Sequence, residues 1–331
     1  MHLKTRIIPL LISLMSVVPL TTKALALPRD TSYTTYQTWQ KIKKNYPQVQ
    51  LAERINDPSL IESSNLVYAS VTDSLNQKRD LHLDIFRPAK KGNYPALIMI
   101  CGGGWRSGNK TMEAPMAQRI ALHGYVTIPV EYRLSTEAKY PAALFDIKAA
   151  IRWVKANAGK YDIDTTHIAI EGNSAGGQLA ALAGMTNNVP KFEGTIGITT
   201  TKSTIHAVID IDGVVDFMAP GSLNLVRKPN SPDVEWLGGT FYDKPGIWKD
   251  ASPIFWVNAR SVPIVFICST QPRFHAGRDE MIDMMNQYKI YSEVHTIPDT
   301  PHTFWLFDPW FESTVKYSVS FLDRVFKPSE K

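Results

Sequence analysis

The stretch His167-Ile-Ala-Ile-Glu-Gly-Asn-Ser-Ala-Gly-Gly177 decides the fold. His167 to Glu171 predict a strand, and the Ala- and Leu-rich segment Ser174 to Met185 predicts a helix directly after it. Glycines two positions before and two positions after Ser174 let neighbouring backbone pack closely around the turn between them. A serine on such a turn is held in a strained conformation with its hydroxyl exposed. Ser174 is therefore a candidate nucleophile.

Short apolar runs and segments with helical spacing alternate on both sides of this turn. Pro95-Ala-Leu-Ile-Met-Ile-Cys101 is apolar throughout, as in a strand that is buried on both faces. This alternation predicts an α/β fold with a mainly parallel sheet and helices on both faces. The predicted strands are 66–71, 81–86, 95–101, 125–132, 167–171, 205–211, 263–268 and 293–297, and the predicted helices are 141–158, 174–185, 281–288 and 311–326.

The chain divides into three parts by composition. Residues 1–26 read as a leader, and residues 27–64 form a polar, helix-leaning N-terminal extension with prolines as breakers. Residues 65–328 then form one catalytic domain. Within it, residues 213–260 are less regular and rich in Pro, Gly and Trp, which predicts a lid-like excursion above the sheet.

The leader has the marks of a secretory signal peptide. Lys4 and Arg6 precede an apolar stretch that is too short to span a bilayer, and Ala24-Leu25-Ala26 is a small-x-small cleavage site. The alternative is an uncleaved membrane anchor. No second long apolar run follows, so we expect no stable membrane insertion of the mature protein. Its expected location is the periplasm or the cell exterior.

Composition and charge exclude several classes of protein. Over 331 residues, 44% are hydrophobic and 20% charged, which rules out a disordered chain. The formal charge is +5, but three cations lie in the acid-free leader, so the remainder carries only +2. That charge gives no support for nucleic-acid binding. Two cysteines are too few for a disulfide scaffold.

A second motif is Cys101-Gly102-Gly103-Gly104-Trp105, which follows the strand that ends at Ile100. Acyl transfer needs backbone N–H groups aimed at the developing oxyanion, and a glycine run lets backbone approach the substrate. Gly103 and Gly104 are the predicted donors, together with the N–H of Ala175 after the nucleophile. The alternative is a flexible turn without chemistry.

A base must take the serine proton, and His302 is the favoured candidate. It follows the last predicted strand in Pro298-Asp299-Thr300-Pro301-His302 and precedes the last helix. His275 is the main rival, because it too lies in a loop after a strand. The other histidines of the mature chain lie within strands or at a helix end, where structural roles are commoner.

These motifs resemble the α/β-hydrolase esterases and lipases, near the acetylesterase and feruloyl-esterase-like carbohydrate esterases. Tyr132-Arg133-Leu134, Tyr140-Pro141-Ala142-Ala143 and Asp146 are similar to a stretch of that family, which leads, as here, into the Ser-Ala-Gly-Gly turn. The resemblance covers about Leu66 to Phe326. It implies an α/β-hydrolase fold with an eight-stranded sheet and a Ser-His-acid mechanism.

The chain departs from the family where the acid is expected. The family places it after the strand that Cys268 ends, but no carboxylate stands near Gln271-Pro272. Asp279 is the first choice, because the altered loop can re-aim it, and Glu280 shares this argument. Asp216 serves if the acid has moved one strand earlier. A Ser-His dyad without an acid is a further alternative.

Two more departures concern the neighbouring positions. Cys101 stands where the family's oxyanion loop usually has His, and the His-Gly pair that usually follows Cys268-Ser269 is absent. The two cysteines end strands that are not neighbours in this fold, which exceeds the reach of a disulfide. We therefore expect two free, buried thiols. Cys268 as a nucleophile is a remote alternative.

Trp105, Arg273 and Arg278 are expected around the mouth of the site by their places in these motifs. Arginine pairs with carboxylates in a bidentate manner, and aromatic rings stack on sugar faces. Such a site favours an acidic glycan such as pectin. The alternative is that Arg278 pairs with Asp279 and that Trp105 packs in the wall.

The resemblance thus implies a secreted serine esterase that removes acetyl, or methyl, esters from plant-type polysaccharides such as pectin or xylan. It implies no metal and no organic cofactor. A general carboxylesterase for small esters is the first alternative. A non-catalytic glycan-binding protein on a hydrolase scaffold is the second, and the oligomeric state is not predicted.

Overall fold

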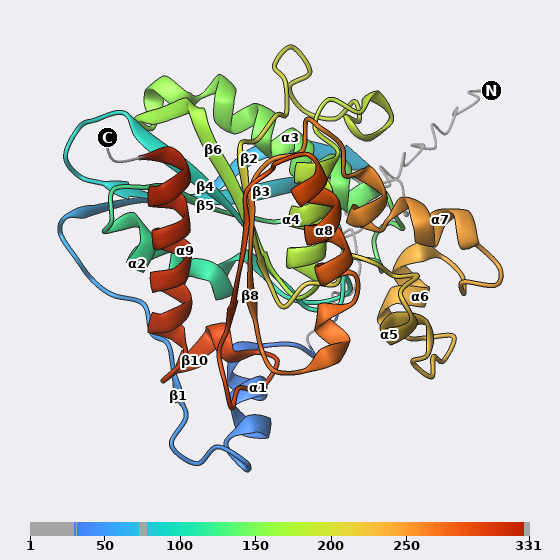
Figure 1. Ribbon diagram of the computed structural model, residues 1–331. Coiled ribbons are helices and arrows are strands. Elements are labelled where there is room, and N and C mark those ends of the chain that lie inside the picture. Colours follow the sequence, from blue (N-terminus) through green and yellow to red (C-terminus); the bar gives the residue numbers. More distant parts are fainter. Residues whose placement is uncertain (1–29, 31, 73–77, 328–331) are drawn as a thin grey trace, which may run out of the picture.

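The computed structural model describes residues 30, 32–72 and 78–327, so the predicted leader lies outside the described residues. An eight-stranded sheet runs through the middle of the protein, in the order β2-β3-β5-β4-β6-β7-β8-β9 (Figure 1). β3 runs antiparallel to both β2 and β5, and all other neighbours are parallel. The strands are β2 (Leu60–Thr72), β3 (Lys78–Pro88), β4 (Tyr94–Ile100), β5 (Val126–Val130), β6 (Ile163–Asn173), β7 (Ala207–Ile211), β8 (Ile264–Cys268) and β9 (Ser292–Thr296).

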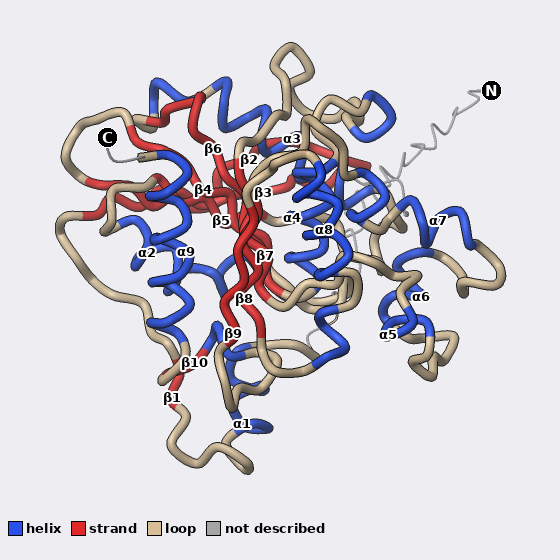
Figure 2. The backbone as a smooth tube through the Cα atoms, viewed as in Figure 1, coloured by secondary structure: helices blue, strands red, loops and turns tan. Residues whose placement is uncertain are grey.

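Helices cover both faces of this sheet, as Figure 2 shows. α2 and α9 pack on one face, and α3, α4 and α8 pack on the other. β4 supplies both cores by simple alternation, with Ile98 and Ile100 on one side and Leu97 and Met99 on the other. The helices are α1 (Thr35–Ile42), α2 (Ala114–Ala121), α3 (Ala142–Ala156), α4 (Ala175–Met185), α5 (Pro220–Leu223), α6 (Pro232–Leu237), α7 (Pro245–Asp250), α8 (Arg278–Gln287) and α9 (Phe311–Phe326). The predicted α/β-hydrolase fold is confirmed.

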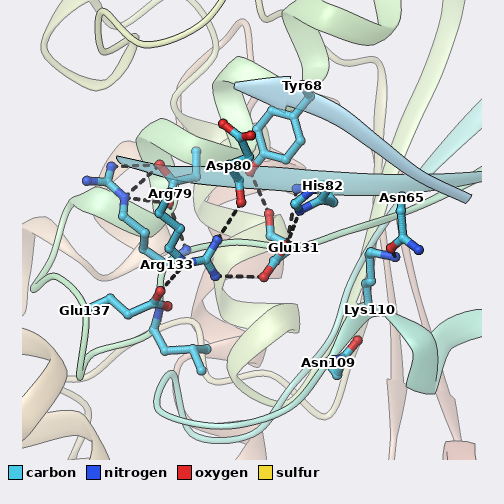
Figure 3. A network of polar contacts seen from close by, with 12 residues as sticks. Asn65, Tyr68, Arg79, Asp80, His82, Asn109, Lys110, Glu131, Arg133 and Glu137 are labelled. Carbon is cyan, nitrogen blue, oxygen red and sulfur yellow. Dashed lines mark hydrogen bonds and ion pairs between the residues drawn. The ribbon is translucent and has the colours of Figure 1, made fainter. Parts of the chain in front are cut away.

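The antiparallel edge of the sheet is held by a network of charged side chains (Figure 3). Arg79 on β3 forms ion pairs with Glu131, which follows β5, and with Glu137. The hydroxyl of Tyr68 on β2 donates to the carbonyl oxygen of Glu131 at 2.6 Å. The network ties β2 and β3 to the loop that follows β5.

Residues 27–64 differ from the predicted helical extension. The described part holds one helix, α1, and then β1 (Gln50–Leu51), which pairs with β10 (Phe307–Asp308). β2 already begins at Leu60, six residues before the predicted strand, because its polar first half is an exposed edge that shows no apolar run. Within the described ranges, no helix combines the length and the apolarity needed to cross a bilayer.

Residues 213–260 leave the sheet after β7 and return at β8. They contain α5, α6 and α7 and the 3-10 helix Pro253–Trp256, which Figure 1 places to one side of the sheet. Trp236 and Trp248 in this segment are fully buried, which agrees with a core role for these rings. Pro232, the first residue of α6, lies against Gly104, so the segment reaches the glycine loop after β4.

Candidate active site

Ser174 stands between the end of β6 and the start of α4, in a strained conformation with φ +53° and ψ −120°. The backbone of this turn lies so close to neighbouring backbone that a side chain at either flanking glycine would not fit. A Cβ on Gly176 would lie 2.0 Å from the carbonyl oxygen of Ile100, and one on Gly172 would lie 2.1 Å from the carbonyl oxygen of Gly176. The glycines therefore let the turn lie directly on β4, with the serine hydroxyl at the carboxyl ends of the parallel strands.

The side chain of His302 lies between Ser174 and a buried carboxylate. His302 Nε2 is 2.8 Å from Ser174 Oγ, and His302 Nδ1 is 2.9 Å from Asp212 Oδ2. Since a carboxylate accepts hydrogen bonds, Nδ1 carries the proton and Nε2 is left to accept from the serine hydroxyl. Asp212 is 1% exposed, and its Oδ1 accepts from the N–H of Ser269 at 2.7 Å. The arrangement is that of a nucleophile, a base and an orienting acid.

The electrostatics of the site keep the imidazole neutral. Burial lowers the pKa of His302, and the hydrogen bond and charge of Asp212 oppose this shift. The positive charge of Arg273 lowers the pKa of His302 further. A neutral imidazole at pH 7 is the form that accepts a proton.

Asp212 corrects the predicted acid, because Asp279 lies at the start of α8 with a side chain that is 73% exposed. It accepts a hydrogen bond from Arg278 at 2.8 Å and does not reach His302. Glu280 is likewise exposed. Asp216 accepts from the N–H of Met218 at 2.7 Å instead.

The position of Asp212 follows from the order of the strands. β7 is the neighbour of β6, and the N–H of Ser174 donates to the carbonyl oxygen of Ile211 at 2.8 Å. Asp212, the first residue after β7, therefore lies beside the nucleophile. It supplies the acid, so the loop after β8 does not have to provide a carboxylate. The signal was an Asp directly after a predicted strand, in Asp212-Gly213-Val214-Val215-Asp216.

The glycine loop after β4 supplies the predicted oxyanion donors. Gly103 and Gly104 have φ of +124° and +60°, and both line one cavity with Ser174 and Ala175. Within the part of the chain that the structure describes, no hydrogen bond occupies the N–H groups of Gly103, Gly104 or Ala175. The N-terminus of α4 adds its partial positive charge beside Ser174. These groups suit a developing negative charge.

The cavity over Ser174 has a volume of about 620 Å³. Arg273 lines it, whereas Arg278 is absent from its walls. Arg278 instead donates to Asp279 and to the sulfur of Cys268, so its predicted place at the mouth is wrong. Trp105 lines the cavity as part of a wall: it is 9% exposed and stacks on Trp236 at 4.8 Å between ring centroids.

Phe274 is a contact of the base that the sequence did not reveal. Its ring stacks on the imidazole of His302, with 3.4 Å between ring centroids and 4° between planes. The guanidinium of Arg273 lies 4.5 Å from the Phe274 centroid. The rival base His275 donates from Nε2 to the carbonyl oxygen of Ser269 at 2.8 Å, away from Ser174.

The cysteines are free and buried. Burial raises the pKa of the Cys268 thiol to about 12, which speaks against a nucleophilic thiolate. Ligand atoms of Asp212, Cys268 and His275 lie within 4.8 Å of one another. However, His302 already engages Asp212, and the Arg278 guanidinium is 3.5 Å from the Cys268 sulfur. This group of side chains does not fit a metal cation.

The fold and the site together define an α/β-hydrolase with a Ser-His-Asp arrangement at the carboxyl ends of its parallel strands. Residues 83–292 match the model of the BD-FAE family, and the chain belongs to this family.

Similar proteins agree with this placement. The probable carboxylic ester hydrolase LipM of Mycobacterium tuberculosis is 32% identical over 67% of this chain and 53% of that protein. The chain spans about half the length of the curated relatives it matches. A truncated carbohydrate esterase from gut microbiota has a TM-score of 0.71 at 27% identity, covering 82% of this chain and 98% of that one. A bifunctional GH43-CE protein of Bacteroides eggerthii has a TM-score of 0.69 at 26% identity, covering 80% and 38%.

Proposed function

We propose that the protein is a secreted carboxylic ester hydrolase that removes acetyl, or methyl, esters from plant-type polysaccharides such as xylan or pectin. The observation that carries the proposal is the 2.8 Å contact between Ser174 Oγ and His302 Nε2 beside unoccupied backbone N–H groups. Hydroxyl, base and donors face one open cavity, which is the constellation that acyl transfer requires.

Ser174 begins the proposed reaction by attacking the ester carbonyl carbon. His302 takes the hydroxyl proton as the new C–O bond forms, and the carbonyl oxygen becomes an oxyanion held by the N–H groups of Gly103, Gly104 and Ala175. The tetrahedral intermediate then collapses, and His302 gives its proton to the departing alkoxide. Water then attacks the carbonyl carbon of the acyl-serine and gives a proton to His302. His302 returns this proton to Ser174 Oγ as the bond between that oxygen and the acyl carbon breaks, which releases the acid and restores the serine hydroxyl.

Asp212 serves this cycle through His302. Its Oδ2 accepts from Nδ1, which fixes the ring and stabilises the imidazolium that forms twice in each turnover. Because Asp212 is itself held by the N–H of Ser269, it keeps its orientation during both proton transfers.

A carbohydrate substrate is favoured by the cavity and by the neighbours. Carbohydrate esterase is part of the name of one similar structure, and the other is a bifunctional GH43-CE protein. Arg106 and Arg227 in the cavity wall are neutralised by ion pairs with Glu235 and Asp233, respectively. Arg273 has no ion-pair partner among the described residues and is exposed to the cavity, which suits a carboxylate of an acidic sugar.

Secretion rests on the sequence alone. Lys4 and Arg6, the apolar stretch after them and the Ala24-Leu25-Ala26 site support export by a signal peptide. A polysaccharide substrate fits this location, because such polymers lie outside the cell.

The experiment is the release of acetate and methanol from acetylated xylan and from pectin, with an aryl acetate as a reference ester. We expect release from at least one polysaccharide by the wild-type protein, with the product naming the ester. Turnover of the aryl acetate alone would leave a general esterase. Release from none of the substrates would contradict the proposed activity and favour a binding protein.

Arg273→Gln in the same assay tests the choice of glycan. We expect kcat/KM on pectin to fall about tenfold, because a charge-assisted hydrogen bond is lost, and we expect the aryl acetate to be unaffected within about threefold. Arg260→Gln, at an exposed position outside the cavity, is the matched control. An equal loss on both substrates would show that Arg273 does not recognise the acidic sugar.

A further inference from the structure

One buried amide joins the two loops of the site. Asn173, the last residue of β6, is fully buried and directly precedes Ser174. Its Oδ1 accepts from the N–H of Gly102 at 2.9 Å, and its Nδ2 donates to Oε1 of Glu113 at 2.8 Å. Gly102 in turn directly precedes the donors Gly103 and Gly104. The turn of the nucleophile and the oxyanion loop are therefore connected through one side chain.

Glu113 determines which way this amide points. It ends the 3-10 helix Lys110–Glu113 and is 1% exposed. An oxygen of the Glu113 carboxyl group accepts a hydrogen bond from the side-chain NH₂ group of Asn173, so the amide oxygen of Asn173 must face Gly102. If the amide turned over, its NH₂ group would meet the N–H of Gly102, and two donors would face each other. Glu113 thus selects the orientation that holds the loop.

The carboxyl group of Glu113 is in an unfavourable place for stability. Burial raises the pKa of Glu113 to about 7. Glu171, also fully buried, lies near enough that the charge of Glu113 adds to burial in raising its pKa well above the usual range. Among the described residues, no hydrogen bond reaches either carboxylate oxygen of Glu171. An apolar side chain at position 113 would avoid the free-energy cost of burying a second carboxyl group near Glu171.

We propose that Glu113 is a positioning residue, which acts through Asn173 to hold the backbone of Gly102–Gly104 in register with Ser174. It touches neither the substrate nor the reacting atoms. The proposal rests on the proposed ester hydrolysis, since the loop it holds is the oxyanion loop of that reaction.

Glu113→Leu is the first test, because it removes the acceptor and also the repulsion with Glu171. We expect kcat on an aryl acetate to fall about tenfold or more with KM within twofold, since oxyanion contacts act in the transition state. The midpoint of thermal unfolding should stay the same or rise. Glu113→Gln keeps an acceptor oxygen for Asn173 and should retain kcat within about threefold.

A matched control separates this effect from the loss of any buried carboxylate. Glu137 is also buried, and its ion pair with Arg79 lies in the edge network of Figure 3. Glu137→Leu should lower the midpoint of unfolding and leave kcat unchanged. Wild-type kcat in Glu113→Leu, or a fall in both kcat and unfolding midpoint that Glu113→Gln shares, would overturn the proposal.

Exchanging donor and acceptor in the hydrogen bond between Asn173 and Glu113 gives a second, independent test. Asn173→Asp places two carboxyl groups against each other and should lower kcat. Adding Glu113→Gln supplies an NH₂ donor to the new Asp, whose other oxygen still accepts from Gly102, so kcat should recover to within about fivefold of wild type. A double variant as impaired as Asn173→Asp alone would overturn the proposal.

The crystal structure of Glu113→Leu reads the loop without any assay. We expect the Asn173 amide to leave its contact with Gly102 and the backbone of Gly103 and Gly104 to shift. An unmoved loop would overturn the positioning role. Failure of the wild-type protein to turn over the aryl acetate would instead overturn the proposed function.

Discussion

We expect Asp212→Asn to lower kcat for ester hydrolysis by about 10³- to 10⁴-fold and to leave the protein folded. Asparagine has a single acceptor oxygen, and the N–H of Ser269 already demands one at this position. The NH₂ group therefore faces Nδ1 of His302. The imidazole must then carry its proton on Nε2, where it cannot accept the proton of Ser174. The measurement is kcat and KM on an aryl acetate, with the unfolding midpoint as the check on folding.

Asp279→Asn is the matched control for this result. Its side chain is exposed and pairs with Arg278, so kcat should stay within twofold of wild type. The reverse outcome, a large loss in Asp279→Asn and a small one in Asp212→Asn, would return the acid to the loop after β8. Equal, small losses in both variants would show that Ser174 and His302 work without an acid.

The second large effect is on folding. Gly176→Ala places a Cβ 2.0 Å from the carbonyl oxygen of Ile100 on β4, where neither backbone segment can retreat without breaking the centre of the sheet. We expect the free energy of unfolding to fall by about 4 kcal/mol or more. The midpoint of thermal unfolding would fall by roughly 10 °C, or no folded protein would be recovered.

Gly159→Ala provides the comparison at a glycine with no crowding. No atom lies within 4 Å of its added Cβ. The substitution should therefore be neutral, or stabilising by about 0.4–1 kcal/mol through the unfolded chain. A Gly176→Ala protein that unfolds within 2–3 °C of wild type, about the effect of a single kcal/mol, would contradict the close approach of α4 to β4.

The central strands and the turn at Ser174 were predictable because their signals are local. Residues such as Leu97 and Met99 are apolar without interruption, and the glycines around Ser174 report a backbone that must approach another segment. His302 was found by the same kind of reasoning, since its loop lies between the last long strand of the sheet and the last helix. Order along the chain was enough for these features.

The acid was missed because its place depends on contacts between distant segments. A carboxylate after any strand is acceptable to local rules, and only the pairing of β7 with β6 shows that Asp212 is beside Ser174. The family comparison also led away from it, towards the loop after β8. Phe274 and Glu113 were hidden for the same reason, since neither the stacking on His302 nor the contact with Asn173 leaves a pattern in the neighbouring residues.

The edge of the sheet was underestimated for a different reason. The first half of β2 alternates weakly and is largely exposed, so the criterion of an apolar run started the strand too late. Its partners on β3 hold it in place through backbone hydrogen bonds, and the N–H of Asn65 donates to Asp84 on β3 at 2.7 Å. The residue pattern of one strand cannot contain such contacts. Arg278 was predicted at the mouth of the site from its place in the sequence motif. Its side chain instead points to Cys268 and Asp279, and a sequence motif does not show the direction of a side chain.

The most direct test of the account is covalent labelling of the protein by an organophosphonate, followed by mass spectrometry of its peptides. The phosphorus centre is attacked by an activated serine and leaves a stable adduct on that residue. We predict one adduct, on Ser174, which is absent in Ser174→Ala and forms at least about a hundredfold more slowly in Asp212→Asn. An adduct on another residue, or hydrolysis of esters by Ser174→Ala at the wild-type rate, would contradict Ser174 as the nucleophile.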